Sequence, residues 1–159
     1  MKPRVVLFYP RTGWDTEGVT TSLPLSVLYV AAPLVADGVE VVLLDDRLLK
    51  EHQAPLEAAL RGGQGVLALG ISAMTGVQIA HGLKAARIAR AAAPGVPIVW
   101  GGVHPTILPE QTLRHPLVDH VVVGEGEECF RELVRRLRAG EPVAELAGLG
   151  SKGPDGGLR

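Results

Sequence analysis

Cysteine is nearly absent from this sequence. The 159 residues contain a single cysteine, Cys129. One thiol cannot form a disulfide within the chain, and it cannot build a multi-cysteine zinc or iron–sulfur site. The sequence also offers no histidine or carboxylate at ligand spacing from His104, so we identify no metal-ligating residue from the sequence.

Net charge and long apolar segments are scarce as well. The formal net charge is −1, from 16 basic and 17 acidic residues, and no basic cluster of the kind that binds nucleic acid is present. The only early apolar run is bracketed by Lys2, Arg4 and Arg11, so neither a signal peptide nor a membrane span is apparent. We therefore expect a cytoplasmic protein without nucleic-acid or membrane partners.

What the chain does contain is five apolar runs alternating with helical patterns. Because continuous apolar strands separated by helices are typical of a parallel sheet covered on both faces, the pattern predicts an α/β protein. Right-handed crossovers then favour a flavodoxin-like (Rossmann-like) five-stranded parallel sheet of order 2-1-3-4-5, with helices on both faces. The predicted strands are 5–9, 39–44, 66–71, 97–100 and 120–123, and the predicted helices are 22–36, with Ser22 as N-cap, 55–61, 77–93, 109–114 and 127–139.

The last part of the chain differs in character from the rest. Residues 1–145 carry the strand–helix alternation, whereas residues 146–159 are rich in glycine and contain the turn sequence Lys-Gly-Pro-Asp-Gly-Gly. We therefore expect one ligand-binding domain over 1–145, followed by a hairpin or a linker over 146–159.

Glycine pairs stand at the ends of two predicted strands. The fourth strand is followed by Gly101-Gly102-Val103-His104 and the fifth by Gly124-Glu125-Gly126. Ligands of parallel sheets bind outside the carboxyl ends of the strands, and glycine lets a ligand lie against bare backbone. These positions predict a slot for a large flat ligand with a polar tail, although a bulge or tight turn also explains paired glycines.

Two further loops leave the same predicted edge. Thr12-Gly13-Trp14 follows the first strand, where the indole is suited either to cover a flat ligand or to anchor a surface loop. Ser72-Ala73-Met74-Thr75-Gly76 follows the third strand, and its hydroxyls suit either a ligand or the cap of the next helix. No arrangement of residues indicates a catalytic site.

These segments, in this order, resemble the cobalamin-binding N-terminal domain of cobalamin-dependent radical S-adenosylmethionine (SAM) enzymes, a group of methyltransferases and an anaerobic cyclase. The resemblance covers nearly the whole chain. The matching elements are Tyr9-Pro10 with its loop, 23–31, 42–45, 70–76, 101–106 and 124–127, and the tail 149–157 is similar to the hairpin before the radical domain.

The resemblance implies cobalamin as the ligand and places residues around it. Ser72, Met74, Thr75 and Gly76 would lie along the lower side of the corrin or the nucleotide tail. Thr12, Gly13 and Trp14 would approach the corrin. The groove of the tail would be lined by Gly101, Gly102, Val103 and His104 and closed by Gly124, Glu125 and Gly126.

Two departures from related domains sharpen this expectation. Methionine-synthase-like domains carry a cobalt-ligating histidine in the first loop, whereas this loop reads Arg-Thr-Gly-Trp-Asp-Thr over 11–16. We therefore expect cobalamin bound base-off, without a protein histidine on cobalt. The three-cysteine motif of the [4Fe-4S] cluster is also missing, so SAM and the cluster are expected only in a partner radical SAM domain, supplied in cis or in trans.

Two other functions remain open at this point. A flavin- or nucleotide-binding protein with the same fold would use the hydroxyl-rich first loop, which contains Thr12, Thr16, Thr20 and Thr21. A pure interaction domain would use the fold without any ligand, because fold alone does not fix function.

Overall fold

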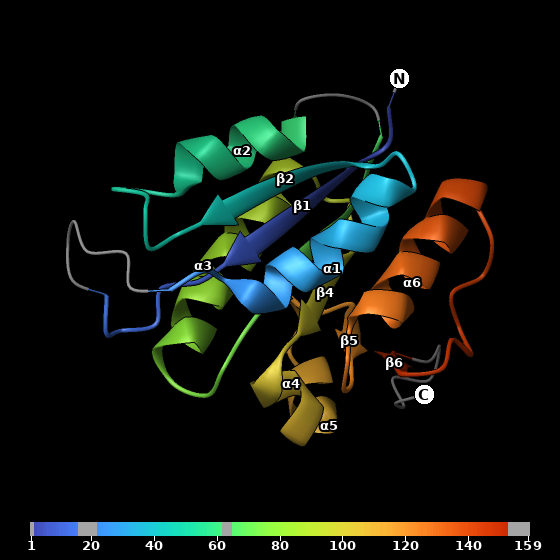
Figure 1. Ribbon diagram of the computed structural model, residues 1–159. Helices are drawn as coiled ribbons and strands as arrows, with labels where there is room; N and C mark the ends of the chain where they lie inside the picture. The colour runs from blue at the N-terminus through green and yellow to red at the C-terminus, as the bar shows by residue number, and fades with distance from the viewer. Residues whose placement is uncertain (1, 16–21, 62–64, 153–159) are drawn as a thin grey trace.

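A computed structural model describes residues 2–15, 22–61 and 65–152 of the chain. Figure 1 shows a twisted central sheet with helices on both faces. Among the described residues, no helix is both long and apolar enough to cross a membrane.

The sheet has six strands in the order β2-β1-β3-β4-β5-β6. The first five are parallel and keep the predicted order 2-1-3-4-5, so the flavodoxin-like topology is confirmed. The prediction of five strands is one short, because β6 pairs antiparallel with β5. The strands are β1 (Arg4–Tyr9), β2 (Glu40–Asp45), β3 (Val66–Ser72), β4 (Ile98–Gly101), β5 (His120–Val122) and β6 (Leu149–Ser151).

The sixth strand comes from the segment expected to be a hairpin or linker. Leu149 pairs with Val122 and Ser151 pairs with His120 across the edge of the sheet, and the His120 Nδ1 and Ser151 Oγ atoms lie 2.7 Å apart. The first part of the tail therefore adds to the sheet, and residues 153–159 lie outside the described part of the chain.

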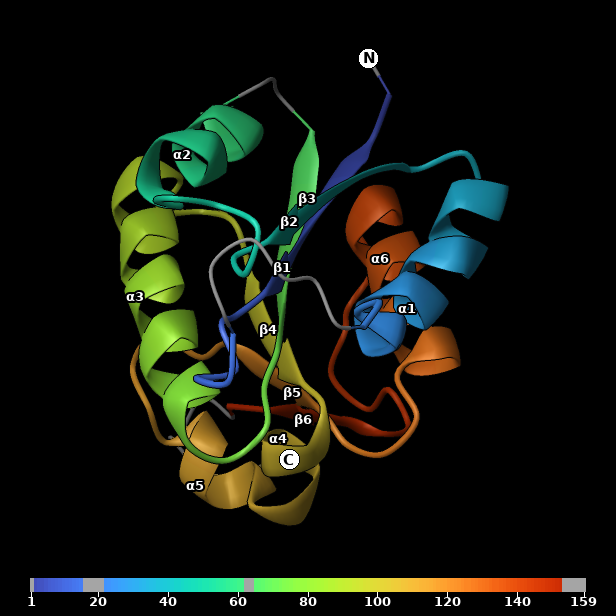
Figure 2. The ribbon, with the colours of Figure 1, turned by 60° about the vertical axis from the view of Figure 1, so that its left-hand side comes forward.

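The helices form one layer on each face of the sheet. Figure 2, which views the sheet nearly edge-on, shows α2 and α3 on one side and α1 and α6 on the other. The helices are α1 (Leu25–Ala36), α2 (Gln53–Arg61), α3 (Val77–Ala92), α4 (Val103–Ile107), α5 (Pro109–Leu113) and α6 (Glu127–Ala139).

Two details of the helices differ from the sequence-based expectation. Helix α1 begins at Leu25 rather than at an N-cap Ser22, because the residue before a proline avoids helical backbone angles and Leu23 precedes Pro24. Helix α4 was not predicted. It is a single short turn that starts directly after Gly102.

The middle residues of the parallel strands are apolar because both faces of the sheet are covered. Successive side chains of a strand point to opposite faces, so Val5 and Leu7 pack against α1 and α6 while Val6 and Phe8 pack in the core beneath α2 and α3. All four are at most 2% exposed. The two cores cover both faces of the sheet, so its carboxyl edge is where loops can meet a ligand. We call this edge the rim; it consists of the ends of β1, β3, β4 and β5 and the loops that follow them.

Candidate cofactor-binding cavity

A cavity of about 360 Å³ opens at the rim on the face of the sheet that carries α1 and α6. We call it the rim cavity. Its volume is near the lower end of the range of ligand sites, about 300–1,000 Å³. It is lined by Leu7, Ser26, Val27, Val30, Gly70, Ile71, Ser72, Val99, Gly101, Gly102, Val103, Thr106, Ile107, Val122, Gly124, Glu125, Gly126, Glu127 and Phe130.

The predicted glycine pairs form part of its wall. A Cβ atom at Gly101 would have Val122 Cβ as its nearest neighbour, at 3.8 Å, and a Cβ at Gly124 would meet nothing within 4 Å. No packing within the protein therefore requires glycine at Gly101. The missing side chains leave space that a guest molecule can use.

Gly102 has a separate structural requirement. Its φ is +94°, a left-handed conformation that favours glycine, and a Cβ there would lie 3.1 Å from the backbone nitrogen of Ala73. The backbone also holds the two loops together, since the Ala73 N–H donates to Gly101 and the His104 N–H donates to the Ala73 carbonyl. Gly102 thus lets the β4–α4 turn lie against the end of β3.

The deep part of the cavity is apolar. Leu7 and Phe130 contribute to its floor, and both are at most 3% exposed. They meet over Gly70, where a Cβ would be 2.8 Å from Leu7 Cδ2 and 3.2 Å from Phe130 Cζ. A flat apolar group suits this part of the cavity.

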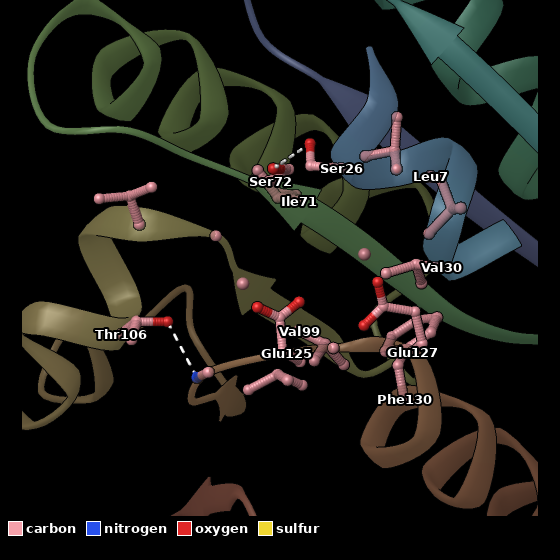
Figure 3. A pocket seen from close by; sticks show the side chains of 18 of the residues that line it. Leu7, Ser26, Val30, Ile71, Ser72, Val99, Thr106, Glu125, Glu127 and Phe130 are labelled. Atoms are coloured by element: carbon pink, nitrogen blue, oxygen red, sulfur yellow. Dashed lines mark hydrogen bonds between the residues drawn. The ribbon is translucent and has the colours of Figure 1, made fainter.

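The mouth of the cavity is polar. Ser26 Oγ and Ser72 Oγ lie 3.1 Å apart on one side, and on the other the Gly124 N–H donates to Thr106 Oγ1 at 3.0 Å. Figure 3 shows both hydrogen bonds, with Glu125 and Glu127 near the opening. Hydroxyls and carboxylates at the entrance can bond hydroxyl or amide groups of a ligand whose apolar end lies inside.

Seven of the predicted binding residues line the rim cavity: Ser72, Gly101, Gly102, Val103, Gly124, Glu125 and Gly126. Met74, Thr75, Gly76 and His104 lie beside it on the rim. Thr75 Oγ1 is 3.0 Å from His104 Nδ1, and the Met74 N–H donates to Gln78 Oε1 at 2.8 Å. Gly76, not Ser72 or Thr75, is the N-cap residue of α3, and no side chain caps that helix.

The first loop lies farther from the rim cavity than the resemblance implies. Gly13 packs toward α3, where a Cβ would be 2.9 Å from Val77 Cγ2, and Trp14 is 91% exposed. The Asp15 carboxylate accepts hydrogen bonds from the backbone N–H groups of Thr12 and Gly13. This places Thr12, Gly13 and Trp14 outside the lining of the cavity.

Sequence reasoning missed the residues contributed by the covering helices. Ser26 and Val30 come from α1, and Phe130 from α6. A buried apolar helix face looks the same in the sequence whether it meets a core or a cavity, so Val30 and Phe130 carried no distinctive signal. Ser26 was the exception, because apart from Tyr29 it is the residue of α1 that carries a hydroxyl, in a helix whose other side chains are apolar.

Cys129 is half-buried on α6 and lies outside the cavity lining. Burial raises the pKa of its thiol. Because the thiolate is the reactive form of cysteine, this thiol is not activated as a nucleophile.

Comparison with protein families identifies the family of this chain. The family model described as the B12 binding domain matches residues 18–134. The chain belongs to the B12-binding domain family. B12 is cobalamin, so the cavity lies within a domain of the class that the sequence resembles.

Relatives of this B12-binding domain include methyltransferases. It is 32% identical over 152 residues to an uncharacterized methyltransferase of Pyrococcus horikoshii, PH0819, covering 94% of this chain and 32% of that protein. It is 43% identical over 61 residues to the 2-(S-pantetheinyl)-carbapenam-3-carboxylate methyltransferase of Streptantibioticus cattleyicolor, covering 38% of this chain and 9% of that protein. The chain thus spans a third or less of these relatives.

Solved structures share the fold of the B12-binding domain. The radical SAM methyltransferase TsrM of Kitasatospora setae, with cobalamin and a [4Fe-4S] cluster bound, matches with a TM-score of 0.81 and 19% identity over 98% of this chain and 30% of TsrM. The cobalamin-dependent SAM radical enzyme OxsB, with aqua-cobalamin and SAM bound, matches at 0.80 and 20% identity over 99% of this chain and 22% of OxsB. A response regulator receiver protein of Sinorhizobium medicae matches at 0.52 and 17% identity over 86% of this chain and 94% of that chain, as expected for a flavodoxin-like sheet.

Proposed function

We propose that this domain binds cobalamin base-off, with the nucleotide tail of the cofactor in the rim cavity and no protein histidine on cobalt. We further propose that it serves a radical SAM methyltransferase, whose other domain would supply SAM and the [4Fe-4S] cluster. The domain is not catalytic alone.

One observation carries the proposal: the open space beside Gly101 and Gly124. A Cβ at either position would meet no atom of the described residues closer than 3.8 Å, although both border an otherwise packed wall. The apolar floor suits the aromatic base at the end of the tail. The hydroxyls of Ser26, Ser72 and Thr106 suit the sugar and phosphate groups that precede it.

The corrin ring is much too large for a cavity of about 360 Å³, so it would remain on the rim. There Met74 is 45% and Val77 is 47% exposed, which offers apolar contacts to a flat ring. The predicted residues Thr12, Gly13, Trp14, Thr75, Gly76 and His104 lie on the loops around this surface. We propose that they contact the corrin rather than the tail.

The proposed absence of a protein ligand on cobalt has two supports. The histidine on the rim, His104, is only 8% exposed, and its Nδ1 lies 3.0 Å from Thr75 Oγ1. The described part of the first loop, 11–15, contains no histidine. When bound, cobalamin supplies a cobalt centre that can carry a methyl group, and this chain's residues hold the tail away from that centre.

The flavin alternative has less support. A phosphate bound at the first loop needs free backbone N–H groups, and those of Thr12 and Gly13 already donate to Asp15. Thr16, Thr20 and Thr21 lie outside the described residues.

The direct test mixes the purified chain with hydroxocobalamin and, separately, with flavin mononucleotide, followed by desalting. We expect corrin absorbance to stay with the protein and the melting temperature to rise, since ligand at 100 times its dissociation constant adds about 2.7 kcal/mol of stability. Retention of flavin but not of corrin would support the alternative, and retention of neither would support an interaction domain.

A further inference from the structure

Two histidines and a carboxylate meet on the opposite face of the sheet from the rim cavity. Asp46 follows β2, His52 directly precedes α2, and His81 lies in α3. Atoms of the three side chains that can bind a metal lie within 4.8 Å of one another. This cluster could not be predicted from the sequence, because Asp46 and His81 are 35 positions apart and only the fold brings the three residues together.

The carboxylate of Asp46 is shared between the two imidazoles. Asp46 Oδ1 lies 2.9 Å from His52 Nδ1 and Asp46 Oδ2 lies 3.1 Å from His81 Nδ1. Zinc–nitrogen and zinc–oxygen bonds of about 2.0–2.2 Å in a tetrahedron place neighbouring donor atoms roughly 3.3 Å apart. The two Asp46–imidazole separations, each to a different carboxylate oxygen, are within a few tenths of an ångström of that spacing, and the ligand atoms of all three residues lie within 4.8 Å of one another. The side chains would therefore have to shift modestly to admit an ion.

Burial favours a defined site with one entrance. The side chains of Asp46 and His52 are 1% and 5% exposed, whereas that of His81 is 32% exposed. His52 packs edge-on against Phe8, with ring centroids 5.4 Å apart, and its Nε2 has no hydrogen-bond partner among the described residues. The polar contact of the His52 ring is therefore the one between its Nδ1 and Asp46. His81 lies on the side of the cluster that is open to solvent.

Arg11 places a positive charge beside this cluster. Its Nε lies 3.8 Å from Asp46 Oδ1, and the guanidinium also donates to the backbone carbonyls of Asp46 and Leu49. Arg11 offsets the negative charge of Asp46, and it repels a cation placed between the two imidazoles. It therefore sets how tightly an ion is held without taking part in its coordination.

We propose that Asp46, His52 and His81 form a binding site for a divalent late transition-metal ion, best matched by Zn²⁺, independent of the cobalamin site. Two imidazole nitrogens and a carboxylate suit Zn²⁺ better than Mg²⁺ or Ca²⁺, which take oxygen ligands. In the bound form Nδ1 of each neutral imidazole and the carboxylate face the ion. A water molecule completes the coordination from the open side at His81.

The test is a calorimetric titration of the chelator-treated, cobalamin-free chain with ZnCl₂. We expect saturable binding of one ion per chain. His81→Ala removes an accessible ligand without leaving a buried void, and we expect it to weaken binding by more than about tenfold. His115→Asn is the matched control, because His115 lies outside the cluster and asparagine can keep the hydrogen bond that its Nδ1 accepts from the Leu117 N–H; its affinity should stay unchanged.

The variant Arg11→Gln tests whether the three side chains bind a metal ion or only stabilise the fold. Removing the neighbouring cation should tighten Zn²⁺ binding by at least roughly fivefold, the factor that one unit charge about 4 Å away is worth in water. The proposal is overturned if no one-to-one binding appears, or if His81→Ala binds Zn²⁺ as well as the unaltered chain. Corrin retention is measured separately, so either proposal can fail without the other.

Discussion

Replacing Gly101 with leucine fills the rim cavity from a position where the protein itself has room. The nearest atom to a Cβ at Gly101 is Val122 Cβ at 3.8 Å, which is ordinary van der Waals contact. The backbone at Gly101 does not require a positive φ. The unliganded protein should therefore keep its stability to within about 0.5 kcal/mol, as surface substitutions usually do.

The cofactor tail, by contrast, would have to share the cavity with the new side chain. Extra methylene groups forced into packed surroundings cost typically about 1–3 kcal/mol, which corresponds to roughly a 5- to 150-fold weaker dissociation constant. The assay is a titration with hydroxocobalamin followed by corrin absorbance, alongside thermal unfolding of the free protein.

Gly95→Leu is the matched control. A Cβ at Gly95 would meet no described atom within 4 Å, and Gly95, like Gly101, has no positive φ, but it lies in the turn before β4, away from the cavity. The reasoning is refuted if Gly101→Leu binds cobalamin as tightly as Gly95→Leu, or if it loses binding only because it unfolds.

Two further predictions concern cobalt ligation and pH. Cob(II)alamin bound to the domain should show no nitrogen superhyperfine splitting in its electron paramagnetic resonance spectrum; a nitrogen-split signal would contradict base-off binding without a histidine. Burial lowers the pKa of His120 below its usual 6.5, so the folded state binds fewer protons than the unfolded chain and stability should fall as pH drops below about 6.5. The melting temperature should decrease from about pH 7.5 to about pH 5.5, and less so in His120→Gln. Hydrogen bonds from Arg135 and Arg136 lower the pKa of Glu132 to about 2, so its stabilising contribution is complete above its usual 4.5 and is lost only as the pH falls below that value. A melting temperature that does not change between about pH 7.5 and about pH 5.5 would contradict the lowered pKa of His120.

The parallel core of the fold could be predicted because burial on both faces makes each strand continuously apolar. The run Val5-Val6-Leu7-Phe8 is buried throughout, and such runs stand out in a sequence. Strand β6 could not be found in this way, since it is three residues long, contains Gly150 and contributes one buried side chain, Leu149.

The candidate site could be predicted at positions where the backbone conformation favours glycine. Gly102 and Gly124 have positive φ and border the cavity, and both were visible as glycines after strands. The direction of the first loop was not visible, because the contacts of Gly13 with Val77 and of Thr12 with Asp15 depend on three-dimensional packing. The cluster of Asp46, His52 and His81 was invisible for the same reason.

The most direct measurement compares cobalamin with cobinamide, which has the same corrin but lacks the nucleotide tail. If the tail occupies the cavity between Gly101, Gly124 and Phe130, cobalamin should bind at least about tenfold more tightly, the effect of roughly 1.4 kcal/mol of tail contacts. Equal affinity for the two molecules would show that the corrin alone is recognised and would contradict the placement of the tail.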